Sequence, residues 1–357
     1  MIVSEVDVWR LQVPLRVPYK LAFGEIRAYD TVLIRIRASD GSVGLGEATL
    51  LAGYSEETVA DSWSVSTKIA PEIIGKDFST AREAIDRYYP SWPFSVCAFT
   101  TALEAIENHA QLQIAKTERV PILGLVGGHT EAEIGASIDQ ALAKGYSTLK
   151  VKVGFEVKSD LAHVETVQRL LAGRGQIRID ANQGFTVEEG KWFASHLNPQ
   201  DIELFEQPCG TDEWAGAQEI ARVATVPMML DESILSLDDI ARAAELKAAR
   251  FIKLKLMKVG GLSRLTKALD YIRDHEMEPV LGNGVAGDIG CWMEACVASK
   301  MVSTTGEMNG SLKPTRSLLK NPLTITDGHV VLEPGYAPEL DLDAVKAVTL
   351  ETSAYAG

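Results

Sequence analysis

Two pairs of lysines stand two residues apart in short apolar segments that read as β-strands. The first pair is Lys150 and Lys152, in Thr-Leu-Lys-Val-Lys-Val-Gly, and the second is Lys253 and Lys255, in Phe-Ile-Lys-Leu-Lys-Leu. Residues two apart in a strand share one face, so both lysines of a pair point to the same side. Lysine is seldom buried without a partner, so the pairs predict carboxylates nearby. The alternative is two lysines at a frayed, exposed strand end.

Three strand-like segments between these pairs end in carboxylates. Asp180 ends Ile-Arg-Ile-Asp-Ala-Asn, where Asn182 shares its face, and Glu206 and Asp231 end the next two segments. Successive charged positions from Lys152 onward are about 25 residues apart, the length of one β/α unit. One such acid could be a helix N-cap, but a set of charges in register predicts a shared site at one end of a parallel sheet.

Three neighbouring carboxylates form an oxygen-rich site suited to Mg²⁺, with Mn²⁺ as the alternative. A substrate carboxylate bound to this metal would lie between Lys152 and Lys255. Removal of the proton from the adjacent carbon gives an enediolate, which the metal and the lysines can stabilise. A lysine acts as a base only when it is neutral, and the neighbouring charges of Lys150 and Lys253 lower the pKa toward neutrality. The predicted catalytic lysines are Lys150, Lys152 and Lys255, and the predicted metal ligands are Asp180, Glu206 and Asp231.

The elements that must position these residues begin after Pro121, where short apolar runs alternate with amphipathic helical stretches. This alternation implies a parallel sheet, and eight units predict a (β/α)8 barrel with its active site at the carboxyl ends of the strands. An open doubly wound sheet is the alternative, but no glycine-rich phosphate turn follows the first strand. The expected strands lie near residues 133–139, 148–154, 177–182, 202–208, 228–233, 251–257, 278–282 and 302–307.

The first part of the chain has a different pattern, which predicts an α+β capping domain. Ile2–Leu15, Thr31–Ala38 and Val43–Glu47 read as antiparallel strands, and residues 56–115 read as helices with a break at residues 90–93. A further strand is expected at His329–Leu332. We expect a cap over residues 1–120, a catalytic barrel over 121–321 and a C-terminal segment, 322–357, that packs back on the cap.

Composition and charge argue against several classes of protein. The 357 residues are 46% hydrophobic and carry a net charge of −14, which disfavours a nucleic-acid partner. The four cysteines form no CxxC pair, so neither a zinc site nor a disulfide framework is expected. No signal peptide is evident, and no run of about 18 apolar residues would span a membrane. We therefore expect a cytoplasmic protein that acts on a small-molecule carboxylate and has no membrane partner.

In combination these motifs resemble the enolase superfamily, in the muconate cycloisomerase-like branch of its mandelate racemase/muconate lactonizing enzyme family. The resemblance covers nearly the whole chain and implies the barrel, the cap, the metal and the two-lysine chemistry. It also implies Asp231 rather than Glu232 as the third ligand, and a homo-oligomeric assembly. The matching residues are Lys150-Val-Lys152, Asp180-Ala-Asn182, Glu206-Gln-Pro208, Asp231-Glu-Ser233, Lys255-Leu-Met-Lys-Val-Gly-Gly261, Gly44-Leu-Gly-Glu-Ala48 and Leu125-Val-Gly-Gly128.

The resemblance also implies that two cap loops, at residues 18–24 and 49–55, close over the substrate. Their aromatic residues would then line the pocket, although packing within the cap is the alternative. It makes Asn182, Asn283 and Asp288 candidates for the pocket as well. The aromatic candidates are Tyr19, Phe23 and Tyr54.

Two departures from the family bear on the substrate. Ala286 stands where many relatives have a glutamate, and Glu307-Met-Asn309 stands where dipeptide epimerases carry Asp-x-Asp. Glu307 remains a candidate for binding a substrate cation, but the departure argues against a dipeptide substrate.

Several reactions fit the same apparatus. Two lysines on opposite faces favour racemisation or epimerisation of an amino-acid derivative or another α-substituted acid. Cycloisomerisation of a muconate-like dienoate and dehydration of an acid are the alternatives. None of the six histidines falls at a predicted strand end, which argues against a racemase in which a histidine faces the lysine. A barrel that uses its metal only to bind a carboxylate is the non-enzymatic alternative.

Overall fold

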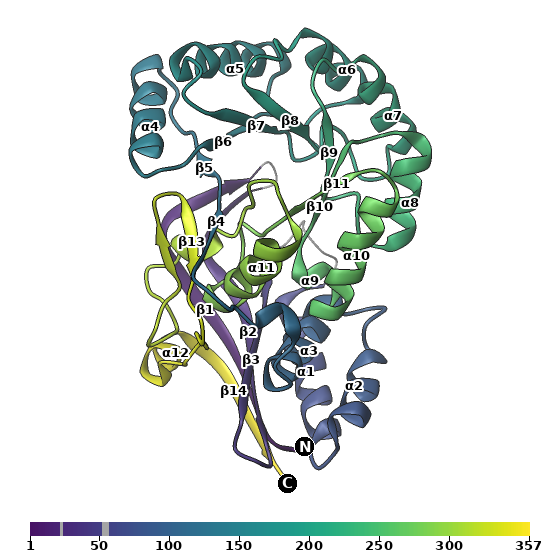
Figure 1. The fold of residues 1–357 in the computed structure, drawn as a ribbon, viewed down its shortest axis with the longest axis vertical. Helices are drawn as coiled ribbons and strands as arrows, with labels where there is room; N and C mark the ends of the chain where they lie inside the picture. The colour runs from purple at the N-terminus through teal and green to yellow at the C-terminus, as the bar shows by residue number, and fades with distance from the viewer. Residues whose placement is uncertain (22–23, 52–56) are drawn as a thin grey trace.

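The structure, a computed structural model, describes residues 1–21, 24–51 and 57–357 (Figure 1). A cap of sheet and helices occupies one end of the molecule, and a curved parallel sheet surrounded by helices occupies the other. Both chain termini lie in the cap, at the end away from the curved sheet. The expected barrel-type fold with an α+β cap is confirmed.

The cap sheet has four antiparallel strands in the order β14-β1-β2-β3. β14 comes from the end of the chain and pairs with β1, so the C-terminal tail completes the cap as expected. The loop expected at residues 18–24 is shorter than predicted, because β1 continues to Leu21, which pairs with Gly24 of β2. The strands are β1 (Val3–Leu21), β2 (Gly24–Ala38), β3 (Val43–Leu50) and β14 (Thr349–Ala356).

Three helices, α1 (Val59–Ile73), α2 (Phe78–Asp86) and α3 (Pro93–Ile106), accompany this sheet. Thr58 caps α1 in a capping box, and Asp77 caps α2. The break expected at residues 90–93 is the start of α3, where Pro93 occupies the first turn. α3 is buried along most of its length and packs against both β3 and the short barrel helix α9 (Leu256–Val259).

The barrel sheet is parallel, with its seven strands ordered β11-β10-β9-β8-β7-β6-β5. Six of the eight expected strands are confirmed within a few residues. The strands are β5 (Gly124–Leu125), β6 (Thr148–Lys152), β7 (Gln176–Asp180), β8 (Ile202–Glu206), β9 (Met228–Leu230), β10 (Phe251–Leu254) and β11 (Glu278–Leu281).

The prediction of a strand near residues 133–139 is wrong, because this segment lies within the helix α4. Thr130 and Glu133 form a capping box at its start, and Ile134, Ile138 and Ala141 are buried on one face. Their spacing of three to four residues is helical, so the capping box was the signal that the strand prediction overlooked. The first barrel strand is instead β5.

The last expected strand, near residues 302–307, forms only an isolated bridge, but it lies where the eighth strand of a barrel would lie. Gly306 forms a parallel bridge with Ile122, and the amide of Leu123 donates to the Gly306 carbonyl over 3.0 Å. On the other side, the amide of Glu307 donates to the Leu281 carbonyl at the end of β11 over 3.1 Å. These contacts join the two edges of the sheet.

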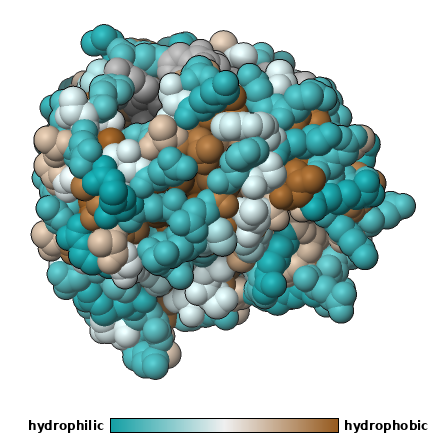
Figure 2. Space-filling model, turned by 90° about the horizontal axis from the view of Figure 1, so that it is seen from above, coloured by the Kyte–Doolittle hydropathy of each residue, from teal (hydrophilic) through white to brown (hydrophobic). Residues whose placement is uncertain are grey.

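Helices surround the curved sheet on the outside (Figure 1). Seen from above in Figure 2, this part of the surface is mostly hydrophilic, with hydrophobic residues in small separate areas. The outer helices are α4 (Glu131–Ala143), α5 (Val157–Leu171), α6 (Val187–His196), α7 (Trp214–Val223), α8 (Leu237–Leu246) and α10 (Leu262–Asp274). Helix α11 (Asp288–Met301) lies toward the cap and contacts β3, β4 (Glu118–Pro121) and β13 (His329–Leu332).

A third, small sheet, in the order β12-β13-β4, was not anticipated as a unit, although β13 (His329–Leu332) is the strand expected there. In the part of the chain that the structure describes, no helix is long and apolar enough to cross a membrane. The remaining elements are β4 (Glu118–Pro121), β12 (Thr324–Thr326), α12 (Leu342–Val348) and the 3₁₀ turns Ala110–Leu112 and Gly310–Leu312.

Candidate active site

Strand pairing places the charged residues of neighbouring strands at one level. Lys152 of β6 lies opposite Asp180 of β7, and Asp180 lies opposite Glu206 of β8. Glu206 pairs in turn with Met229 of β9, and Asp231 follows two residues later. These positions are at the carboxyl ends of their strands, which is the end of a barrel that carries active sites.

Two buried lysines lie between the carboxylates. Lys150 Nζ is 2.8 Å from Asp180 Oδ2 and 3.0 Å from Glu206 Oε2. Lys253 Nζ is 2.9 Å from Glu206 Oε1 and 3.4 Å from Asp231 Oδ2. Because both lysines are buried, these charges are neutralised by one another at close range instead of by water.

Glu307, at the eighth barrel position, joins the same network. Its carboxylate is 3.1 Å from Lys150 Nζ and also pairs with Lys253. The residue is only 4% exposed. The carboxylate that the sequence made a candidate for a substrate cation is therefore engaged by two lysines of the protein itself.

Lys152 and Lys255 flank the row of carboxylates at its two ends. Lys152 Nζ is 2.5 Å from Asp180 Oδ2 and also donates to Asn182 Oδ1. Lys255 Nζ donates to Asp231 Oδ1 and Oδ2 over 2.7 and 2.6 Å. Since β7, β8 and β9 separate β6 from β10 in the sheet, the two amines reach the row from different sides.

The lysines differ in how readily they lose a proton. Burial lowers the pKa of Lys255 to about 8, despite the opposing charge of Asp231. Burial also acts to lower the pKa of Lys150, but Asp180, Glu206 and Glu307 outweigh it and raise that pKa above its ordinary value. Lys255 can therefore become neutral near physiological pH, whereas Lys150 stays protonated.

The acids at the two ends of the row remain ionised. Burial opposes the charge of Asp180, but Lys150 and Lys152 outweigh it and lower its pKa to about 2. The same balance, with Lys255 as the largest favourable neighbour, holds the pKa of Asp231 well below its usual range. Glu232 behaves differently, because burial and then the charge of Asp231 raise its pKa to about 7.

The donor set suits a hard divalent cation in its chemistry and in its place on neighbouring strand ends, although the side chains are not gathered around one point. Asp180, Glu206 and Asp231 offer buried carboxylate oxygens from the ends of three adjacent strands. Within residues 1–21, 24–51 and 57–357, no three acidic, histidine or cysteine side chains are gathered closely enough to enclose an ion as they stand. Lys150 and Lys253 lie between the carboxylates, so a bound cation would replace part of the positive charge that these amines supply.

Of the other candidate pocket residues, one joins the charged cluster and two make contacts elsewhere. Asn182 joins the cluster, because its Nδ2 donates to Glu232 Oε1 over 2.8 Å beside its contact with Lys152. Asn283 is buried and accepts the amide of Val285 over 2.8 Å, which stabilises its own turn. Asp288 lies apart from the cluster and accepts from Ser317 Oγ and the Leu323 amide over 2.9 and 3.0 Å, which ties it to the segment after the barrel.

The structure describes only the backbone of one of the three aromatic candidates in the cap. Phe23 and Tyr54 lie outside the described residues. Tyr19 belongs to β1 and pairs with Ile26, and its side chain is not among those described.

Sequence reasoning missed two residues that hold Asp231. Lys258 is buried and donates to the carbonyl oxygen and Oδ1 of Asp231 over 2.8 and 3.1 Å. Gln207 Oε1 accepts the amides of Asp231 and Ser233 over 3.0 and 3.3 Å. Both residues stand within motifs that carry the family resemblance, Glu206-Gln-Pro208 and Lys255-Leu-Met-Lys-Val-Gly-Gly261, but neither of them was assigned a role from the sequence.

Comparisons with known proteins agree with this arrangement. The N-terminal domain of mandelate racemase / muconate lactonizing enzyme matches residues 3–127, and an enolase C-terminal domain-like family matches residues 133–344. The chain is 27% identical to muconate cycloisomerase 1-2 of Acinetobacter lwoffii, over 98% of this chain and 96% of that protein. It is 25% identical to an N-succinyl-L-Arg/Lys racemase of Bacillus cereus, over 98% of each.

A solved structure has the same fold. It is a dipeptide epimerase from Cytophaga hutchinsonii, complexed with Mg and the dipeptide D-Ala-L-Val, which superposes with a TM-score of 0.88 at 20% identity. The match covers 99% of this chain and all of that one. These relatives are racemases, epimerases and cycloisomerases, which are all isomerases. The chain belongs to the mandelate racemase/muconate lactonizing enzyme family of the enolase superfamily.

Proposed function

We propose that this protein is a metal-dependent racemase or epimerase that moves the proton on the carbon next to a substrate carboxylate. One observation carries the proposal. Lys152, at the end of β6, and Lys255, just after β10, lie at the two ends of a row of buried carboxylates. A carbon held between two such amines can lose its proton to one and regain a proton from the other, which inverts its configuration.

In this proposal Asp180, Glu206 and Asp231 hold Mg²⁺, with Mn²⁺ as the alternative. When bound, the cation would bind the substrate carboxylate and stabilise the negative charge that develops on it. Gln207 and Lys258 hold the Asp231 segment in place, so that the third ligand keeps its orientation.

The lysines have distinct roles. Lys255, with its lowered pKa, is the base for one enantiomer, and Lys152, a quarter exposed, is the base for the other. Lys150 stays protonated among its carboxylates, so it supplies fixed positive charge instead of taking a proton. This role agrees with the neighbouring charge expected from the sequence for Lys150 among the catalytic lysines.

The preferred substrate is an α-substituted acid without a free ammonium, such as an N-acylated amino acid. Glu307, which the sequence made a candidate for binding a substrate cation, is engaged by Lys150 and Lys253. An additional cation there would be repelled by those two amines. Asn182, Asn283 and the cap segments at residues 18–24 and 49–55 with their aromatic residues are proposed to line the pocket, although residues 22–23 and 52–55 of these segments lie outside the described part of the chain.

We also propose the division of the chain into a cap, residues 1–120, a catalytic barrel, residues 121–321, and a C-terminal segment, residues 322–357. The pairing of β14 with β1 supports assigning the last part to the cap.

A second reaction, cycloisomerisation of a dienoate, is favoured by the 27% identity to a muconate cycloisomerase over nearly the whole chain. It would use the same cation but only one lysine as proton donor or acceptor. Loss of that lysine should then abolish the reaction and loss of the other should leave it intact, whereas racemisation needs both.

The experiment follows the α-proton by NMR in deuterated buffer with Mg²⁺. Single enantiomers of N-acylated amino acids, dipeptides, proline derivatives and hydroxy acids are tested beside muconates. We expect an N-acylated amino acid to exchange and racemise, and Lys152→Ala and Lys255→Ala each to abolish racemisation. Lys191→Ala, which removes an exposed lysine paired with Glu219, is the matched control and should behave as wild type.

Other outcomes would change the assignment. Lactone formation from a muconate would favour the cycloisomerase. Tight binding of a carboxylate with no exchange at all would favour a binding protein without catalysis.

A further inference from the structure

The segment that carries Lys255 is fixed at both of its ends by buried carboxylates. After β10 the chain forms the short helix α9, a Gly260-Gly261 turn and then α10. At the first end, Glu294 Oε1 of α11 accepts the amide of Leu256, the residue after Lys255, over 2.8 Å.

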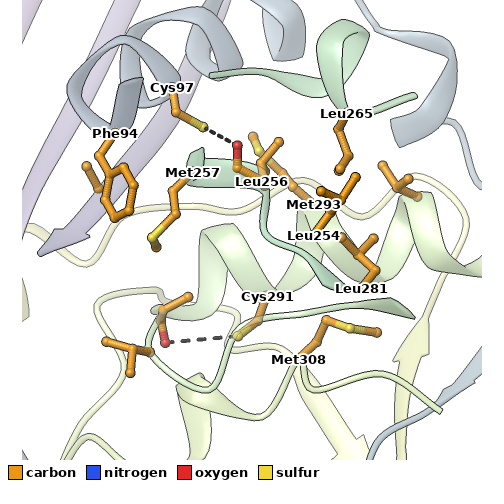
Figure 3. Packing of buried hydrophobic residues seen from close by; sticks show 14 of the residues in the cluster. Phe94, Cys97, Leu254, Leu256, Met257, Leu265, Leu281, Cys291, Met293 and Met308 are labelled. Carbon is orange, nitrogen blue, oxygen red and sulfur yellow. Dashed lines mark hydrogen bonds between the residues drawn. The ribbon is translucent and has the colours of Figure 1, made fainter. Parts of the chain in front are cut away.

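The cap holds the same end of this segment. Cys97 of the cap helix α3 donates from its Sγ to the Leu256 carbonyl over 3.4 Å. Figure 3 shows this contact, with the side chains of Met257 and Met293 packed close by. The backbone next to Lys255 is therefore held by barrel and cap together.

At the second end, the contacts come from the cap helix α3. Glu104 of α3 accepts the amides of Leu262 and Ser263, over 2.7 and 2.9 Å, and Ser263 Oγ over 2.7 Å. These amides open helix α10 and have no partner within that helix. Glu104 is 2% exposed, so its carboxylate takes the place of water at this helix end.

The glycine turn allows this close contact. Gly261 has φ +148°, and a Cβ there would lie 2.8 Å from Thr100 Cγ2 and 3.2 Å from Glu104 Oε2. At Gly260, with φ +74°, a Cβ would lie 2.5 Å from Tyr89 Cε2. A side chain at either position would push the segment away from the cap.

The backbone that follows the opposite lysine is held by a different carboxylate. After Lys152, Asp160 Oδ2 of the barrel helix α5 accepts the amides of Gly154, Phe155 and Glu156 over 2.9, 2.8 and 3.1 Å. Among the described residues, these backbone contacts after Lys152 come from the barrel, whereas those after Lys255 come from the barrel and from the cap helix α3.

We propose that Glu104 of the cap is a positioning residue for Lys255, acting through the Leu256–Ser263 segment, and that it has no comparable effect on Lys152. The proposal rests on the two-lysine racemase function described above. Because each lysine takes the proton from one enantiomer, disturbing Glu104 should slow α-proton exchange of one enantiomer selectively.

The test substitutes Glu104→Gln. Glutamine presents a single acceptor oxygen and turns an amide NH₂ toward one of the donors, which loosens the anchor. For the enantiomer that needs Lys255, we expect the initial rate of deuterium exchange to fall between about tenfold and a hundredfold, as small misplacements of reacting groups do. For the other enantiomer the initial rate of exchange should change less than about twofold, because the substitution leaves Lys152 in place. Ser263→Ala, which removes one of the three bonds, should act in the same direction but less strongly.

Glu47→Gln is the matched control. Glu47 is another buried cap glutamate at the start of a barrel helix, where its Oε1 accepts the amides of Gly287 and Gly290 over 2.6 and 3.0 Å. Glutamine keeps that acceptor, and we expect no selectivity between enantiomers. An equal loss for both enantiomers in Glu104→Gln would overturn the positioning role and leave Glu104 as a general stabiliser.

A second readout does not need turnover. Amide hydrogen exchange, measured by mass spectrometry, should show faster exchange in residues 256–263 of Glu104→Gln, with residues 153–160 unchanged. If the amides of residues 256–263 are as well protected in Glu104→Gln as in wild type, Glu104 does not anchor this segment, whatever the activity of the variant. If the wild type exchanges no substrate while protection of 256–263 is lost in the variant, the proposed function fails. The positioning role then falls with it, and the anchor itself remains.

Discussion

Lys255 donates hydrogen bonds to both carboxylate oxygens of Asp231, over 2.7 and 2.6 Å, in a site from which water is almost excluded. The same pair therefore links a proposed metal ligand to a proposed base. Burial lowers the pKa of the lysine to about 8, although Asp231 acts in the opposite direction. The amine can thus change its protonation state in the pH range in which most enzymes work.

This pKa predicts a pH dependence for proton exchange of one enantiomer. A lysine takes a proton only when neutral, so the initial rate of α-proton exchange of the enantiomer that uses Lys255 should rise about tenfold per pH unit below the pKa and level off above it. The measurement is this initial exchange rate, followed by NMR in deuterated buffer for each enantiomer from about pH 6 to 9.5. Lys255→Arg should be inactive throughout, because the guanidinium stays protonated. A flat profile would argue against Lys255 as the base.

Lys150 should matter for stability as much as for catalysis. Lys150→Met leaves Asp180, Glu206 and Glu307 without one of their buried cations, and breaking such an arrangement costs on the order of 3–5 kcal/mol. Added Mg²⁺ should restore part of the loss, because a ligand that binds only the folded state stabilises it. Urea denaturation with and without Mg²⁺ measures both effects. Lys191→Met, in an exposed pair, should change stability little, and equal effects at the two sites would contradict the prediction.

Metal binding should depend on the three carboxylates one by one. Asp180→Asn, Glu206→Gln and Asp231→Asn should each weaken Mg²⁺ binding by more than the roughly tenfold that loss of an outer-shell partner can cost. Isothermal titration calorimetry of substrate-free protein measures this directly. Asp238→Asn removes an exposed acid of α8 and should bind Mg²⁺ as wild type does. Undiminished binding in all three variants would place the ion elsewhere.

Glu47 should make stability fall with rising pH. Burial raises its pKa from 4.5 to about 7, so the folded protein keeps a proton that the unfolded chain releases. Stability is therefore lost as the pH rises from about 4.5 to about 7, and the loss is complete above that range. Glu47→Gln keeps the acceptor oxygen without the charge. Its advantage over wild type should grow to on the order of 3 kcal/mol between pH 5 and pH 8 in urea denaturation. A difference that does not vary with pH would contradict this origin.

Local sequence patterns were enough to predict where most of the site residues lie along the barrel. The period of two in a strand put Lys150 and Lys152 on one face, and the regular spacing put Lys152, Asp180 and Glu206 at the same level of the sheet. The strand expected near residues 133–139 failed because a capping box at Thr130 specifies a helix there. Patterns of this kind are local, so a single chain segment reveals them.

The pairing of charges between distant parts of the chain could not be predicted from such patterns. Glu307 proved to be paired with Lys150 and Lys253, and Glu104 proved to anchor the start of α10, more than 150 residues away in the chain. The protonation behaviour of Lys255 and Lys150 likewise depends on burial and on partners from other strands. Such contacts join residues that share no local pattern, and their energies depend on the exclusion of water. They are therefore set by the packing of cap against barrel, which no segment of the sequence encodes alone.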